Sequence, residues 1–336
     1  SPDGKTIAFA TDRGPRTDFK TLAFSNFRIA LYDLATGNVR VLDHMDQGKN
    51  VSPQWSPDGK SIAILASDAP PRWAQSGAIQ IFPASGGQPK TLLTSFDAQP
   101  GIAGWSSDGK RIYFAEPKGT GTQIYSADVA ANRIDEIKVT TAVIGAFSLN
   151  DSGTTFAFVR QTPDTPADVY IASAADFTPV QITTVNAGMK IPPVGRTEVV
   201  TWKSKDGKQI EGLLTYPVGY QTGQRVPLIL NIHGGPAGVF QQTFLGGRGV
   251  YPLATFSSRG YAILRPNPRG SSGYGTDFRR ANLKDWGFGD YQDLMTGVDR
   301  VIEMGVADPA RLGVMGWSYG GFMTSWVVTQ TNRFKA

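Results

Sequence analysis

The chain has 336 residues, with 33 Lys and Arg against 28 Asp and Glu, which gives a formal net charge of +5. It contains no Cys and only two His, so the composition excludes a disulfide framework, a thiol nucleophile, and Cys-ligated or His-rich metal sites. At about 150 residues per domain, the length predicts two domains. With 40% hydrophobic residues and no 18-residue apolar run, we expect a soluble protein with no membrane partner.

The charge is unevenly distributed along the chain. Residues 1–195 have a net charge of −1, and residues 196–336 have +6. Because the basic residues are scattered and form no Lys/Arg run, we predict no nucleic-acid partner. The chain opens on Ser1 inside a turn motif, so we expect further residues upstream and make no prediction of the compartment.

A repeated motif occupies the first part of the chain. Its copies are separated by 55, 50 and 42 residues. They lie at Ser1–Lys5, Trp55–Lys60, Trp105–Lys110 and Phe147–Gly153. Each copy is a turn that precedes an apolar run of β character and a second strand pair, a pattern typical of four-stranded propeller blades. Asp58 and its equivalents are interpreted as turn residues that bond their own backbone.

This pattern resembles the WD40-like, Tol-B-type β-propeller repeat over roughly residues 1–185. The resemblance implies a partial β-propeller of about four blades, which we assign to residues 1–190, with more blades expected upstream. The sequence from Thr178 to Val194 is rich in Pro and is interpreted as a connector.

Beyond the connector, residues 191–336 alternate strands with longer helical stretches, a pattern that favours a parallel α/β sheet. We expect an antiparallel hairpin from residues 198–214 and a helix from Asp290 to Gly305, with Asp290 as its N-cap. Three core strands are predicted at 228–232, 261–264 and 311–315. This region is assigned as the N-terminal portion of an α/β-hydrolase domain.

A G-x-S-x-G sequence, Gly316–Gly320, follows the last predicted strand and precedes an apolar stretch. Such a strained strand-to-helix turn exposes a serine hydroxyl as a nucleophile, here Ser318. The residue after the serine opens the helix, so the Tyr319 N–H is predicted to point at a developing oxyanion.

A second glycine motif, His233–Pro236, follows the strand at 228–232. It has the form of the loop that donates the other oxyanion N–H in α/β hydrolases, and Gly235 is the candidate donor. We do not assign His233 as the catalytic base, because the triad order on this fold is Ser, then Asp or Glu, then His. His44 lies within the repeats and receives no functional role.

These motifs are joined by two others, Asn267–Gly275 and Asp308–Arg311. In this order behind a propeller, they resemble the prolyl oligopeptidase family of serine peptidases, in particular its acylaminoacyl-peptidase and dipeptidyl-peptidase-like branch. The resemblance implies that Ser318 is the acylating nucleophile and that Tyr319 and Gly235 form the oxyanion hole. It also implies a propeller that admits only short peptides, no cofactor or metal, and a full-length protein compatible with a homo-oligomer.

The chain departs from the family after the nucleophile. Residues 319–336 contain no His, Asp or Glu, whereas the resemblance places the triad Asp and His after the serine. We therefore expect an internal fragment of a longer peptidase, with the triad Asp and His beyond Ala336. We predict that the fragment is inactive alone, and stoichiometric labelling of its Ser318 by a fluorophosphonate would contradict this.

Three alternatives remain. A dipeptidyl peptidase would need propeller acids to hold a substrate amine, and the only adjacent pair is Asp135-Glu136, which argues against that version. A carboxylesterase would use the same chemistry. A Tol-B-like interaction propeller with a non-catalytic appendage would have no need of an oxyanion hole. Dinucleotide binding is disfavoured because Gly270, Gly273 and Gly275 do not match G-x-G-x-x-G.

Overall fold

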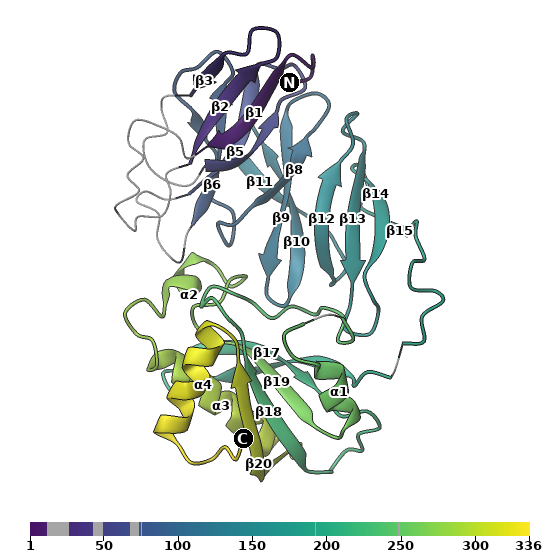
Figure 1. The fold of residues 1–336 in the computed structure, drawn as a ribbon, viewed down its shortest axis with the longest axis vertical. Helices are drawn as coiled ribbons and strands as arrows, with labels where there is room; N and C mark the ends of the chain where they lie inside the picture. Colours follow the sequence, from purple (N-terminus) through teal and green to yellow (C-terminus); the bar gives the residue numbers. More distant parts are fainter. Residues whose placement is uncertain (12–26, 43–49, 68–73, 75, 192, 248) are drawn as a thin grey trace.

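The computed structural model describes all residues except 12–26, 43–49, 68–73, 75, 192 and 248. Within the described residues, the first half of the chain forms separate antiparallel sheets, one of three strands and three of four (Figure 1). Their strands are β1 Thr6–Thr11, β2 Arg28–Asp33 and β3 Val39–Val41; β4 Asn50–Trp55, β5 Ser61–Ser67, β6 Gly77–Pro83 and β7 Lys90–Thr91; β8 Gly101–Trp105, β9 Arg111–Lys118, β10 Gly121–Asp128 and β11 Arg133–Ile137; and β12 Val143–Leu149, β13 Thr155–Gln161, β14 Asp168–Ser173 and β15 Val180–Gln181.

The repeated motif forms the turn between the first two strands of each four-stranded sheet. In the β4–β5 turn, Ser56 Oγ donates to Asp58 Oδ1 at 2.7 Å, and the Lys60 N–H donates to the same oxygen at 3.0 Å. The predicted turn role of Asp58 is confirmed. The predicted connector at 178–194 is wrong at its start, because β15 pairs there with β14 and completes the fourth sheet.

Neighbouring sheets of the repeats bury apolar side chains between them. Ile62 and Ile64 of β5 share a core with Ile29 and Leu31 of β2, and all four side chains are at most 5% exposed. Because side chains alternate between the two faces of a strand, each four-stranded sheet can contribute to the packing on both of its sides. The repeats therefore form one stacked β structure.

The second half of the chain contains a five-stranded sheet with the order β16-β17-β19-β18-β20. Its strands are β16 Thr197–Lys203, β17 Gln209–Thr215, β18 Val226–Ile232, β19 Ala262–Asn267 and β20 Ala307–Gly316. The expected hairpin is β16–β17, and the three predicted core strands are β18, β19 and β20. The prediction of a parallel sheet holds only for β18 with its neighbours β19 and β20, since β17 pairs antiparallel with both β16 and β19.

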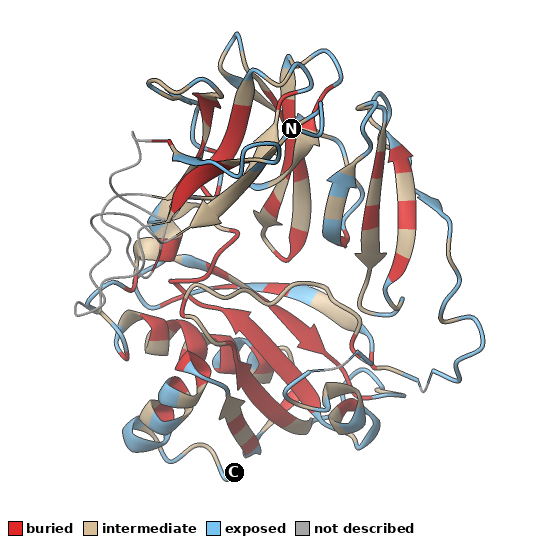
Figure 2. Ribbon diagram, turned by 45° about the horizontal axis from the view of Figure 1, so that its top comes forward, coloured by how far each residue is buried: buried red, intermediate tan, exposed pale blue. Residues whose placement is uncertain are grey.

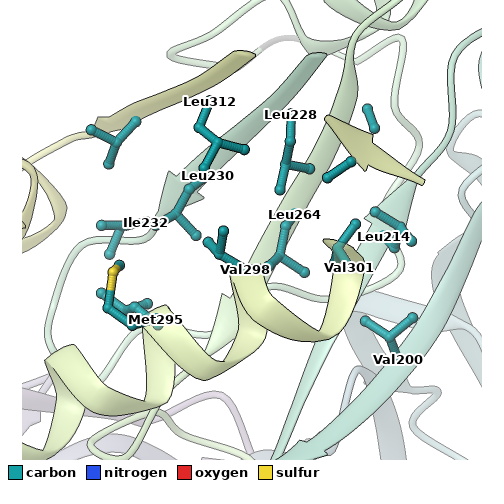
Figure 3. Packing of buried hydrophobic residues seen from close by; sticks show 14 of the residues in the cluster. Val200, Leu214, Leu228, Leu230, Ile232, Leu264, Met295, Val298, Val301 and Leu312 are labelled. Atoms are coloured by element: carbon teal, nitrogen blue, oxygen red, sulfur yellow. The ribbon is translucent and has the colours of Figure 1, made fainter. Parts of the chain in front are cut away.

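Four helices accompany the described part of this sheet, namely α1 Leu253–Ser258, α2 Thr276–Arg280, α3 Gly289–Glu303 and α4 Tyr319–Gln330. Helices α3 and α4 cover one face. Val298 and Val301 of α3 pack with Leu230 and Leu264 of the sheet (Figure 3), and Met323 of α4 belongs to the same core. The central strands β18 and β19 are buried along nearly their whole length (Figure 2), which explains why most of their residues are apolar.

The two halves of the chain meet at the turn between β9 and β10. The Gly119 N–H donates to Gly273 O at 2.7 Å, and the Gln242 N–H donates to Thr120 O at 2.8 Å. Gln242 lies in the loop after β18, which also carries the predicted oxyanion donor Gly235, and Gly273 lies in the loop after β19. No helix in the described ranges is long and apolar enough to cross a membrane.

Candidate active site

The turn between β20 and α4 carries Ser318. Its φ of 58° and ψ of −121° place a residue with a side chain in a sparsely populated conformation. The flanking glycines are required by close packing: a Cβ on Gly316 would lie 2.3 Å from Gly320 O, and one on Gly320 would lie 2.1 Å from Ile232 O. The two glycines therefore permit a strained turn in which the start of α4 packs closely against β18.

This turn presents the serine hydroxyl outward. Ser318 is exposed, and the described part of the chain offers its hydroxyl no hydrogen-bond partner. Tyr319 is the first residue of α4, so its N–H has no acceptor within the helix. A hydroxyl and a helix N-terminal N–H thus lie on adjacent residues, which suits nucleophilic attack with stabilisation of an oxyanion.

The glycine loop after β18 lies against this turn. A Cβ on Gly234 would be 3.3 Å from Ser318 Cβ and 3.2 Å from Trp317 O, so only a glycine fits there without a shift. Gly235 has a φ of 131° and is followed by a cis peptide bond to Pro236. The structure therefore brings the second predicted motif next to the predicted nucleophile.

His233 holds this loop to the turn that follows β19. Its Nδ1 lies 2.8 Å from Gly234 O, and its Nε2 lies 2.9 Å from Ser271 Oγ. A carbonyl oxygen can only accept, so Nδ1 carries the proton and Nε2 faces the Ser271 hydroxyl. Burial lowers the pKa of His233 from 6.5 to about 4, which keeps the ring neutral. Both ring nitrogens of His233 therefore have partners within the two loops.

The turn that carries Ser271 is anchored by an ionic cluster that the sequence analysis missed. The Arg269 N–H and Nε donate to Asp293 Oδ2 at 2.8 and 2.9 Å, and Nη2 donates to Asp293 Oδ1 at 2.7 Å. Asp206 accepts from Nη1 at 2.9 Å on the more exposed side. These bonds raise the pKa of Arg269. The sequence carries no clear signal of this cluster, because the residues three, four and seven positions after Asp293 in the helix are Thr296, Gly297 and Arg300.

Asp290 makes a second contact near the site that was not predicted from the sequence. Its predicted role as N-cap of the helix is wrong. Helix α3 begins at Gly289 with Phe288 as N-cap, so Asp290 lies in the first turn. Its carboxylate accepts hydrogen bonds from the Gly287 and Tyr291 N–H groups, both at 2.8 Å, and from the Tyr319 hydroxyl. Burial raises the pKa of Asp290. The Asp290 carboxylate therefore fixes the side chain of Tyr319, the residue that follows Ser318.

The remaining candidate residues of the sequence lie elsewhere. His44 lies outside the described residues. Asp135 and Glu136 are on β11, where Asp135 pairs with Arg133 at 2.8 Å and Glu136 pairs with Lys118 at 2.5 Å. In the ranges that the structure describes, no group of three or more His, Asp or Glu side chains could hold a metal ion.

Comparison with known proteins gives this geometry a family context. The family model described as the prolyl oligopeptidase family matches residues 251–336, the segment that contains the Ser318 turn. The uncharacterized peptidase YuxL of Bacillus subtilis is 35% identical over 234 residues, which are 69% of this chain and 35% of that protein.

Two further proteins are similar over almost the whole chain. Dipeptidyl-peptidase 5 of Porphyromonas gingivalis is 25% identical over 97% of this chain and 47% of its own length. The structure of Pyrococcus horikoshii acylaminoacyl peptidase superposes with a TM-score of 0.79 at 25% identity, covering 99% of this chain and 50% of that one. The chain spans about half the length, or less, of the curated relatives it matches.

Proposed function

The chain belongs to the prolyl oligopeptidase family, and we propose that it carries the nucleophile and oxyanion hole of a serine peptidase for short peptides. The single observation that supports this most is the strained, exposed Ser318 at the end of β20, with Gly234 packed against it. Such a backbone conformation costs free energy and is concentrated at functional sites, so it is not expected in a non-catalytic appendage.

In the proposed reaction, Ser318 Oγ attacks the scissile carbonyl carbon while its proton passes to a general base. The carbonyl oxygen becomes an oxyanion, which accepts hydrogen bonds from the N–H groups of Tyr319 and Gly235. Collapse of the tetrahedral intermediate breaks the C–N bond, protonates the amine and leaves an acyl-enzyme, which water then hydrolyses.

The general base in this proposal is a group other than His233. The Nε2 of His233 faces Ser271, and the low pKa of the buried ring opposes formation of the imidazolium that a base must become. The role of His233 is instead to hold the Gly234–Gly235 loop in place. Asp293 and Arg269 support this loop indirectly, because they fix the turn that carries Ser271, the partner of His233.

We further propose that the sheets of residues 1–190 form part of a β-propeller that restricts access to the α/β-hydrolase domain at 191–336. The contacts of Gly119 and Thr120 with the loops after β18 and β19 support this, because they place the edge of the repeats beside the site. The relatives are named dipeptidyl peptidase and acylaminoacyl peptidase. These names favour substrates from which a short or blocked N-terminal segment is removed. Asp135 and Glu136 are already paired with basic residues, which argues against their holding a substrate amine.

The test uses the full-length protein and a panel of short peptides and esters. We expect a fluorophosphonate probe to label Ser318 and peptide hydrolysis to fall by a factor of about 10³ or more in Ser318→Ala. Ser325→Ala, an exposed serine on the same helix, is the matched control and should retain activity. Unchanged peptide hydrolysis in Ser318→Ala would favour the interaction propeller, and ester cleavage without peptide cleavage would favour a carboxylesterase.

A further inference from the structure

Two polar side chains lie on the face of the five-stranded sheet that points away from α3 and α4. In the parallel pair β18–β19, Leu230 is opposite Leu264, and both belong to the core under α3. Side chains alternate along a strand, so the following residues, Asn231 and Arg265, lie side by side on the other face. Asn231 is 4% exposed and Arg265 is 3% exposed.

Arg265 is buried with little to compensate its charge. Its Nη2 donates to Thr215 Oγ1 at 3.2 Å, its guanidinium lies 5.9 Å from the centre of the Phe240 ring, and its Nε has no partner. No Asp or Glu in the described part of the chain is paired with it, and burial alone lowers its pKa to about 10. In contrast, the buried Arg269 and Arg279 are each paired with a fully buried Asp.

A buried guanidinium with unused N–H groups is costly unless a ligand meets it. Arg265 lines a pocket of about 270 Å³ next to the proposed nucleophile. The walls also include Asn231, Phe240, Leu245, Gly234 and Trp317. No Asp or Glu is among the described lining residues, and the neighbouring His233 is neutral, so Arg265 is the one formal charge of this described wall.

The pocket wall opposite the sheet is held in a fixed position. Asn267, at the end of β19, accepts a hydrogen bond from the Phe240 N–H at 2.7 Å and donates one to Phe240 O at 3.0 Å. The Phe240 ring packs edge to face on His233, with 5.3 Å between ring centres. This wall is thus tied to the oxyanion loop, and Gly234 and Trp317 place the pocket directly beside Ser318.

We propose that this pocket is a subsite for a carboxylate of the peptide substrate and that Arg265 is its specificity-determining residue. A carboxylate matches the fork of a guanidinium and can accept two hydrogen bonds from it, while the apolar walls hold the adjoining carbon atoms. The carboxylate belongs either to the C-terminus of a short peptide or to an Asp or Glu side chain. The inference rests on the proposed peptidase function and names the class of substrate.

The first experiment changes the ligand and keeps Arg265. Full-length Ser318→Ala protein, which binds without turnover, is titrated by calorimetry with Ala-Ala-Ala and its C-terminal amide, and with Ala-Asp-Ala-amide and Ala-Asn-Ala-amide. We expect the acid to bind about tenfold more tightly than its neutral partner in one of the two pairs. The first pair reports a terminal carboxylate and the second a side-chain carboxylate. Equal binding in both pairs would overturn the proposal.

The second experiment changes Arg265 in the same background. Arg265→Gln should abolish the preference and Arg265→Lys should retain part of it, whereas Arg259→Gln, which removes an exposed charge at the end of α1, should leave it intact. A preference that persists in folded Arg265→Gln would overturn the assignment. If that variant does not fold, a crystal structure of Ser318→Ala with the preferred acid decides, since its carboxylate must contact the Arg265 guanidinium.

These results separate the subsite from the peptidase proposal. Labelling of wild-type Ser318 by a fluorophosphonate, together with equal binding of acids and amides, would overturn the subsite alone. A carboxylate preference without labelling or hydrolysis would overturn the peptidase proposal and support a carboxylate-binding pocket.

Discussion

Arg279 and Asp97 form an ion pair in which both side chains are fully buried, with Nη1 2.8 Å from Oδ2. Arg279 comes from α2 in the second half of the chain, and Asp97 follows β7 in the repeats. Asp97 Oδ1 also accepts a hydrogen bond from the Gly275 N–H at 2.9 Å. This pair fastens the repeats to the turn that follows β19, close to the candidate site.

Removing one member of the pair should destabilise the protein strongly. In Arg279→Met the Asp97 carboxylate stays buried without its cation, and we expect a loss of about 3 kcal/mol or more in the free energy of unfolding, measured with urea. Asp299→Asn is the control, because its pair with Arg333 is half-exposed and should contribute less than about 1 kcal/mol. Similar losses in both variants would contradict this prediction.

Two neighbouring glycines of α4 should respond in opposite ways to alanine. A Cβ on Gly320 would lie 2.1 Å from Ile232 O, whereas one on Gly321 has Gly316 O as its nearest neighbour at 3.4 Å. Gly320→Ala should cost about 2 kcal/mol or more, because backbone must move, and should abolish fluorophosphonate labelling. Gly321→Ala should be neutral or stabilising by up to about 1 kcal/mol. Equal thermal stability of the two variants would refute this.

The two acidic partners of Arg269 should differ in importance. Asp293→Asn leaves a buried arginine with a neutral partner, and we expect a loss of about 3 kcal/mol. Asp206→Asn should cost less than about 1 kcal/mol, since the Asp206 side chain is 51% exposed and screened by water. Chemical denaturation of both variants measures the difference, and the reverse order would show that Asp206 is the main anchor.

His233 should make stability depend on pH in the acid range. Its pKa is about 4 in the folded protein against 6.5 ordinarily, so the neutral ring favours folding. This contribution is fully present above pH 6.5 and is lost as the pH falls to about 4, because the unfolded chain binds the proton first. It amounts to about 3 kcal/mol. In His233→Gln, the unfolding midpoint should vary less between pH 7 and 4, and an unchanged pH profile would exclude His233 as its source.

The local features of this protein follow from short stretches of its sequence. The Asp-Gly turns, the strands of the repeats and the strand-turn-helix around Ser318 are all readable, because their physical causes lie within a few residues. Asp58 bonds its own turn, and the glycines around Ser318 permit a conformation and an approach that other residues cannot adopt. Alternating strands and helices similarly indicated the second sheet.

The partners of the buried polar groups, in contrast, depend on the tertiary structure. Arg279 meets Asp97 from 182 residues away, His233 turns its Nε2 towards Ser271, and Arg265 finds no carboxylate among the described residues. Burial and partner choice depend on which distant segments pack together, and they set the cost of each charge. For the same reason, the mixed strand order and the position of Asp290 within α3 could not be predicted from local pattern.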